Sequence, residues 1–170
     1  MPSDVVVGVA DCRVSNDPGH VLVTYALGSC IAVAIHDPTV GVGGLLHFML
    51  PDSALDRVKA AKNPFLFADT GIPLLFRTAY EKGASKHRLR VQVAGGAQVL
   101  DASGTFNIGE RNYLALRKIL WKAGVRIHNE AVGGAASRTV RLEVLSGKFW
   151  LRTPGMADQE IPRALPFGRG

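Results

Sequence analysis

Short apolar runs alternate with turn-forming residues along much of the chain, a pattern typical of strands in an antiparallel sheet. The clearest case is a pair of apolar stretches, residues 30–37 and 42–50, which flank Pro-Thr-Val-Gly and predict a β-hairpin. Further strands are predicted over residues 5–15, 20–27, 88–97 and 125–134, and two more within residues 137–153 around Ser-Gly. Residues 51–65 are polar and broken, and predict a loop with one short turn.

Two segments, residues 69–83 and 107–124, follow a helical period instead. The first begins at a capping residue, Asp69 or Thr70, and both segments end at a glycine. Apolar residues three or four apart line one face of each: Ile72, Leu75, Phe76 and Ala79, then Tyr113, Leu116, Leu120 and Ala123. Strands and two main helices mixed along one chain predict an α/β layered fold of the α+β class. In it the helices pack on one side of an antiparallel-rich sheet.

Length and composition place these elements in one domain. The 170 residues, 47% hydrophobic and 20% charged, suit a globular chain with its own core. We expect a single domain over residues 1–153, and a loose extension over the proline- and glycine-containing residues 154–170. No apolar run reaches the length of a membrane span, and the first residues lack a basic segment typical of a secretory signal. We therefore expect a cytoplasmic protein without membrane insertion, whose two cysteines are reduced thiols.

The net charge of +6 raises the question of an anionic partner. The densest basic stretch, residues 86–90, has no interleaved aromatic residues and fits a solvated strand edge better than a nucleic-acid site. Two glycine pairs, in residues 93–98 and 131–137, each follow a predicted strand. Neither has the spacing of a phosphate-binding loop, so close backbone approach or a bulge explains them more simply. Nucleic acid and nucleotides are thus not expected as ligands.

Candidate chemistry begins with Cys30, at the start of the predicted hairpin. A cysteine nucleophile needs a base, and His47 lies in the partner strand. If the turn comprises only Pro38 and Thr39, Cys30 stands directly opposite His47, with Cβ atoms about 5 Å apart. A longer turn shifts this register, and an odd shift places the two on opposite faces. His36 shares the face of Cys30 but lies too far along the strand.

Residues before Cys30 supply the other groups that such a site needs. Gly28 permits a sharp turn at which backbone N–H groups of Gly28 and Ser29 face a developing oxyanion. No acid lies between Thr24 and Cys30, but the Thr24 hydroxyl can accept a hydrogen bond from an imidazole N–H. The alternative from spacing alone is a buried structural cysteine beside a core histidine. A metal site built from both cysteines, His36 and His47 is disfavoured, because no ligand-pair spacing is present.

Several blocks together resemble the CheD family of chemoreceptor glutamine deamidases. They are T-x-x-L-G-S-C-x-A-V at 24–33, H-x-M-L-P at 47–51, F-A-D-T-x-I-P-L-L at 67–75, GGA at 95–97, IGERN at 108–112 and GG-x-x-x-R at 133–138. They run in the family's order over about residues 5–150. The resemblance implies a layered fold similar to the deamidase domain of cytotoxic necrotizing factor toxins. It also implies Cys30 as nucleophile, His47 as base and Thr24 as the residue that orients the histidine.

The activity that this resemblance implies is hydrolysis of glutamine side chains on methyl-accepting chemotaxis receptors, with release of ammonia through a thioester. No cofactor or metal is required. The partners implied are the cytoplasmic helices of these receptors and, in some bacteria, the CheC phosphatase. Two other functions stay open at this point: a receptor- or CheC-binding regulator without catalysis, and an unrelated thiol protease.

Overall fold

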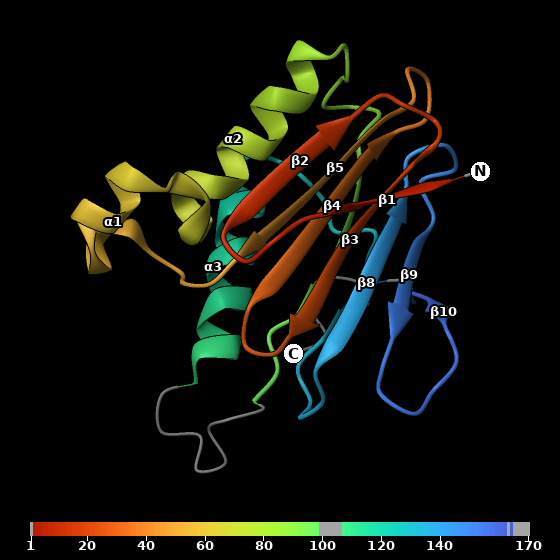
Figure 1. Ribbon diagram of the computed structural model, residues 1–170. Coiled ribbons are helices and arrows are strands. Elements are labelled where there is room, and N and C mark those ends of the chain that lie inside the picture. Colours follow the sequence, from red (N-terminus) through yellow and green to blue (C-terminus); the bar gives the residue numbers. More distant parts are fainter. Residues whose placement is uncertain (1, 99–106, 163, 165–170) are drawn as a thin grey trace.

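The computed structural model describes residues 2–98, 107–162 and 164 of the chain, which form a pair of five-stranded sheets that lie against each other (Figure 1). One sheet has the order β1 (Ser3–Val6), β3 (His20–Leu27), β8 (Arg138–Glu143), β9 (Phe149–Arg152), β10 (Gln159–Glu160). The other has the order β2 (Asp11–Ser15), β5 (Val42–Phe48), β4 (Ile31–Asp37), β6 (Arg90–Gly95), β7 (Asn129–Val132). Only the β1–β3 and β6–β7 pairs are parallel among these strands.

The described helices are α1 (Arg57–Lys62), α2 (Ala68–Glu81) and α3 (Ile108–Lys122), with short 3₁₀ turns at Ser53–Leu55 and Pro64–Leu66. Helices α2 and α3 cover one face of the second sheet, so that the described chain forms three layers, and α1 lies to one side (Figure 1). The α+β class and the antiparallel-rich layering are confirmed. The expectation of one sheet is incomplete, because a second sheet packs on the face that the helices leave open.

Strand β4 shows why two layers are needed. Every residue of β4 is buried. Val33 and Ile35 pack toward the helices, whereas Ala32 and Ala34 pack toward the other sheet. A strand that is apolar on both faces must be covered on both faces.

Most predicted elements match the structure within a few residues, including both main helices and the hairpin of β4 and β5. Residues 5–15 are different, because β1 and β2 belong to different sheets and are separated by a turn that begins near Gly8. Residues 51–65 contain α1, the first 3₁₀ turn and the start of the second, which ends at Leu66. The side chains of Asp52, Asp56 and Asn63 cap them, and no residue of α1 is buried, so no apolar period predicts this helix.

The segment after β9 returns to the sheet. Gln159 and Glu160 pair with β9, Ile161 is buried, and the side chain of Asn129 donates to the carbonyl of Ile161 at 3.0 Å. A loose extension was expected from residue 154, but residues 159–161 are held against the sheet. Residues 165–170 lie outside the described residues. No described helix has the length and hydropathy needed to cross a membrane.

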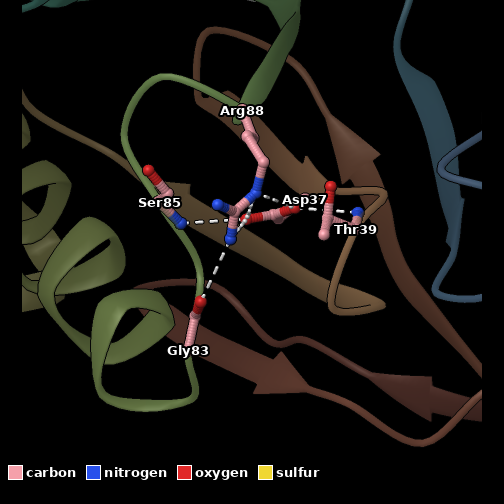
Figure 2. Close-up of polar contacts among 5 residues, drawn as sticks. All are labelled: Asp37, Thr39, Gly83, Ser85 and Arg88. Atoms are coloured by element: carbon pink, nitrogen blue, oxygen red, sulfur yellow. Dashed lines mark hydrogen bonds and ion pairs between the residues drawn. The ribbon is translucent and has the colours of Figure 1, made fainter.

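The end of β4 farthest from Cys30 is fastened by an ion pair between the buried Asp37 and the partly exposed Arg88 (Figure 2). The Asp37 carboxylate is fully buried and accepts from the backbone N–H of Thr39 and of Ser85, both at 2.9 Å. The Arg88 guanidinium adds bonds of 3.0–3.1 Å. These bonds outweigh burial and lower the pKa of Asp37. They join the β4–β5 turn to the loop between α2 and β6.

Candidate active site

Thr24, Cys30 and His47 come from three different segments. Thr24 lies in β3 of one sheet and His47 in β5 of the other, while Cys30 directly precedes β4. The turn between β4 and β5 has four residues, and the ladder pairs His47 with Ala32 rather than with Cys30. The assumed two-residue turn is therefore wrong. The resulting shift of two residues is even, so it preserves the face. Cys30 and Ala32 both pack in the cluster between the two sheets.

The Thr24 hydroxyl determines which nitrogen of His47 carries a proton. It donates its only hydrogen to the carbonyl oxygen of Val7 at 2.7 Å. Its oxygen lies 2.8 Å from Nδ1 of His47 and must act there as acceptor, so Nδ1 carries the hydrogen. In the neutral ring Nε2 then has the free lone pair. The hydrogen bond crosses from one sheet to the other.

Burial controls the charge of His47. The residue is 1% exposed, and burial lowers its pKa from 6.5 to about 4. Nε2 has no hydrogen-bond partner among the described residues. Asp11 stands opposite His47 in the β2–β5 ladder, but its carboxylate accepts from the backbone of Gly8 and Cys12. At neutral pH the imidazole is thus an uncharged base with a vacant acceptor nitrogen.

Cys30 is half-buried, at a bend between β3 and β4. Burial is the largest influence on its thiol and raises the pKa above the ordinary value, against a smaller opposite effect of its own backbone N–H. The thiol is therefore neutral at rest. No hydrogen bond joins it to Nε2 in this conformation, and such contacts often tighten only when substrate is present. With both the thiol and the imidazole neutral, attack by the sulfur requires proton transfer from the thiol.

Backbone contacts hold the bend that carries Cys30. The carbonyl of Gly28 accepts from the N–H of Ala97, and that of Cys30 from Gly96, each at 2.9 Å. Gly95 has φ +112°. A Cβ at Gly95 would lie 2.2 Å from the carbonyl oxygen of Cys30, so no other residue fits without movement. The predicted close backbone approach at the first glycine pair is confirmed.

The second glycine pair and Arg138 form hydrogen bonds that hold the end of β6 at Gly95, next to the Cys30 bend. The N–H of Gly133 donates to the carbonyl of Gly95 at 2.9 Å. The Arg138 guanidinium donates to the carbonyls of Gly95 and Gly133 at 3.0 and 2.6 Å. In the sequence these residues stand out only as members of blocks shared with a family, because no local pattern indicates contacts between segments so far apart.

The remaining cysteine and histidine candidates lie elsewhere. The ring of His36 is buried, its Nε2 lies 2.8 Å from the carbonyl of Val144, and it packs closely on Gly147. Cys12 packs in the cluster on the helix side of the sheet, and burial raises its pKa to about 12. The described residues contain no cluster of three or more histidine, cysteine or acidic side chains arranged to hold a metal ion.

Comparisons with known proteins identify the family of the chain. Residues 49–153 match the family model described as CheD chemotactic sensory transduction, a range that begins just after His47. The chain is 54% identical over 158 residues to the "Probable chemoreceptor glutamine deamidase CheD" of Solibacter usitatus, covering 93% of this chain and 94% of that protein. It is 56% identical over 158 residues to the "Probable chemoreceptor glutamine deamidase CheD 1" of Syntrophus aciditrophicus, covering 93% and 99%. The similar protein of Clostridium tetani is 40% identical over 158 residues, with 91% and 94% covered. The chain belongs to the CheD family.

Proposed function

We propose that this protein is a protein-glutamine deamidase that acts on chemoreceptors, with Cys30 as nucleophile, His47 as general base and acid, and Thr24 as the residue that orients His47. The observation that carries the proposal is the Thr24–His47 hydrogen bond. This bond leaves Nε2 unprotonated in the layer between the sheets, where the Cys30 thiol also packs. The names of the relatives, chemoreceptor glutamine deamidases, support the choice of reaction.

The first half of the reaction forms a thioester. As the Cys30 sulfur attacks the glutamine carboxamide carbon, its proton passes to Nε2 of His47. The tetrahedral intermediate then collapses, the C–N bond breaks, and the nitrogen takes the proton back from Nε2 and leaves as ammonia. Throughout, Nδ1–H remains bonded to Thr24, which keeps the ring in the productive orientation.

The second half of the reaction releases glutamate. Nε2 accepts a proton from water as the water oxygen attacks the thioester carbonyl, and the C–S bond breaks. The proton returns to the Cys30 sulfur and the resting pair is restored. The net change is glutamine and water to glutamate and ammonium. The same steps hydrolyse a γ-glutamyl methyl ester, with methanol leaving in place of ammonia.

Backbone N–H groups at the bend serve as donors to the oxyanion. The carbonyls of Gly28, Ser29 and Cys30 all accept hydrogen bonds from groups of β6, α3 or the loop between them. Among the described residues, the N–H groups of Ser29 and Cys30 donate to no oxygen of another residue, although the N–H of Cys30 interacts with its own thiol. The proposed oxyanion site at Gly28 and Ser29 therefore extends to the N–H of Cys30.

The substrates are glutamines on the helical cytoplasmic region of receptors, which places the enzyme in the cytoplasm. Those helices are typically acidic, and a net charge of +6 favours the encounter. Each deamidation adds a negative charge and creates a carboxylate that can be methylated. A CheC phosphatase that competes for the same surface is the expected regulatory partner where one is present.

The test is ammonia release from a purified receptor cytoplasmic fragment, together with mass analysis of its glutamine peptides. The wild type and Cys12→Ser release ammonia at similar rates and convert amide to acid without cleaving the chain. Cys30→Ala binds the fragment but releases none. Ammonia release by Cys30→Ala rejects the mechanism, cleavage of the fragment indicates a protease, and binding without turnover by the wild type indicates a non-catalytic regulator.

A further inference from the structure

The side-chain amide of Asn112 connects the two sides of the candidate site. Asn112 lies in α3 and is 0% exposed. Its Nδ2 donates to the carbonyl of Ser29 at 3.0 Å and to the carbonyl of Met49 at 2.8 Å. Ser29 directly precedes Cys30, and Met49 follows His47 by two residues. Both hydrogens of one nitrogen are thus bonded, one on each side of the site.

These two bonds lie where the β4–β5 ladder ends. The last pair of the ladder is Ile31 with Phe48, and the next pair in this register would be Cys30 with Met49. The chain bends away at Cys30, so no backbone pair continues the ladder. The Asn112 amide takes that position, and it maintains the spacing of the two strands at the point where the thiol leaves the sheet.

Contacts of α3 hold the amide in place. A Cβ at Gly109 would lie 2.4 Å from the carbonyl oxygen of Gly96, so the first turn of α3 sits directly on the loop that bonds Cys30. The Oδ1 atom of Asn112 is buried and has no hydrogen-bond partner among the described residues. An unpaired buried oxygen opposes folding, so stability alone does not account for an amide at this position.

We propose that Asn112 is a positioning residue that sets the Cys30 bend relative to His47. The inference rests on the proposed function for its catalytic meaning, but it also makes a claim about thiol reactivity that needs no substrate. Without the amide, the carbonyls of Ser29 and Met49 lose their donors and the bend separates from the end of β5. The Cys30 thiol and Nε2 of His47 then adopt a geometry that allows proton transfer in a smaller fraction of molecules.

The experiment compares Asn112→Leu, which keeps the side-chain shape, with Asn112→Ala, which leaves a cavity. Both remove the two hydrogen bonds. Asn129→Ala is the matched control, because Asn129 is a buried asparagine that donates to a carbonyl elsewhere in the fold. All variants are made with Cys12→Ser, so that iodoacetamide reports Cys30 alone. The readouts are kcat, KM, the rate of alkylation at pH 7 and the melting temperature.

We expect kcat to fall about a hundredfold in both Asn112 variants, with KM little changed and with a parallel fall in the alkylation rate. Asn129→Ala lowers the melting temperature but leaves kcat and alkylation near the reference values. The proposal is overturned if Asn112→Leu keeps the wild-type kcat and alkylation rate. If the leucine variant does not fold, the proposal is overturned when kcat and the alkylation rate fall no further in Asn112→Ala than in Asn129→Ala. A different outcome separates the two proposals. If the Cys12→Ser reference protein releases no ammonia from receptors but Asn112→Leu still slows alkylation of Cys30, the proposed function is rejected and the positioning role of Asn112 is retained.

Discussion

The Thr24 hydroxyl lies 2.8 Å from Nδ1 of His47 and gives its own hydrogen to the backbone of Val7. This single oxygen therefore holds the imidazole from the opposite sheet and selects its tautomer. In many thiol and serine enzymes a carboxylate or an amide takes this position. A neutral hydroxyl stabilises the imidazolium less than a carboxylate, which agrees with the low pKa of His47.

Removal of this hydroxyl is predicted to impair catalysis and stability together. Thr24→Val keeps the shape but leaves Nδ1–H and the Val7 carbonyl without a partner in a buried layer. We expect kcat/KM to fall about 10- to 100-fold and the free energy of unfolding to fall by about 1–3 kcal/mol. Thr24→Ser retains the hydroxyl and should stay near the wild type. Equal activity of the valine and serine variants contradicts the orienting role.

The pH profile of activity is predicted to have an acidic limb near pH 4. The proposed mechanism needs neutral His47, whose pKa is lowered to about 4, so kcat/KM should stay high down to about pH 5. An exposed histidine would instead give a limb near 6.5. The measurement is the initial rate of ammonia release across pH 3.5–8, with folding followed at each pH. A limb near 6.5 contradicts the buried neutral base.

The same lowered pKa predicts how stability depends on pH. Between pH 6.5 and 4 the unfolded chain binds a proton at His47 that the folded chain does not, so stability decreases as the pH falls through this window. The full effect is about 3 kcal/mol at about 1.4 kcal/mol per pH unit. Denaturant unfolding of the wild type and of His47→Gln separates this contribution from those of the carboxyl groups. If the free energy of unfolding depends on pH in the same way in both proteins, His47 makes no such contribution.

Replacement of Gly95 is predicted to disturb the bend that carries Cys30. In Gly95→Ala the new Cβ collides with the carbonyl of Cys30 in a backbone conformation that favours glycine. We expect a loss of about 2–6 kcal/mol in the free energy of unfolding and slower alkylation of Cys30. The control is Gly155→Ala, where φ is +78° but nothing lies within 4 Å of the added atom. It should lose only about 1–2 kcal/mol and keep normal alkylation.

The Asp37–Arg88 pair is predicted to stabilise the fold without affecting chemistry. Arg88→Ala leaves the buried carboxylate with two backbone donors, and we expect a loss of about 2–4 kcal/mol, because Arg88 is 40% exposed and some of its attraction is screened. The lowered pKa of Asp37 means that its contribution is present above pH 4 and disappears below it. The kcat per folded molecule should be unchanged, since Asp37 and Cys30 lie at opposite ends of β4. A large fall in kcat with little destabilisation contradicts this separation.

The sequence was sufficient for most local elements because their signals are local. Alternation predicts β3 and the β4–β5 hairpin, and apolar spacing with glycine stops predicts α2 and α3. Helix α1 was missed, since it buries nothing and depends on side-chain caps. The division of residues 5–15 between two sheets was also missed, because a single apolar run does not indicate which partner each half will join.

For the candidate site, the sequence by itself determined which residues to propose: a thiol and an imidazole on one predicted hairpin, and a hydroxyl upstream. Only the tertiary structure decided how they are held. The bond from Thr24 to His47 joins strands of two sheets, and Asn112 and Gly95 reach the Cys30 bend from segments more than sixty residues away. The low pKa of His47 arises from the same packing. Hydrogen bonds and burial between distant segments exist only once the layers have assembled, so no local pattern in the chain records them.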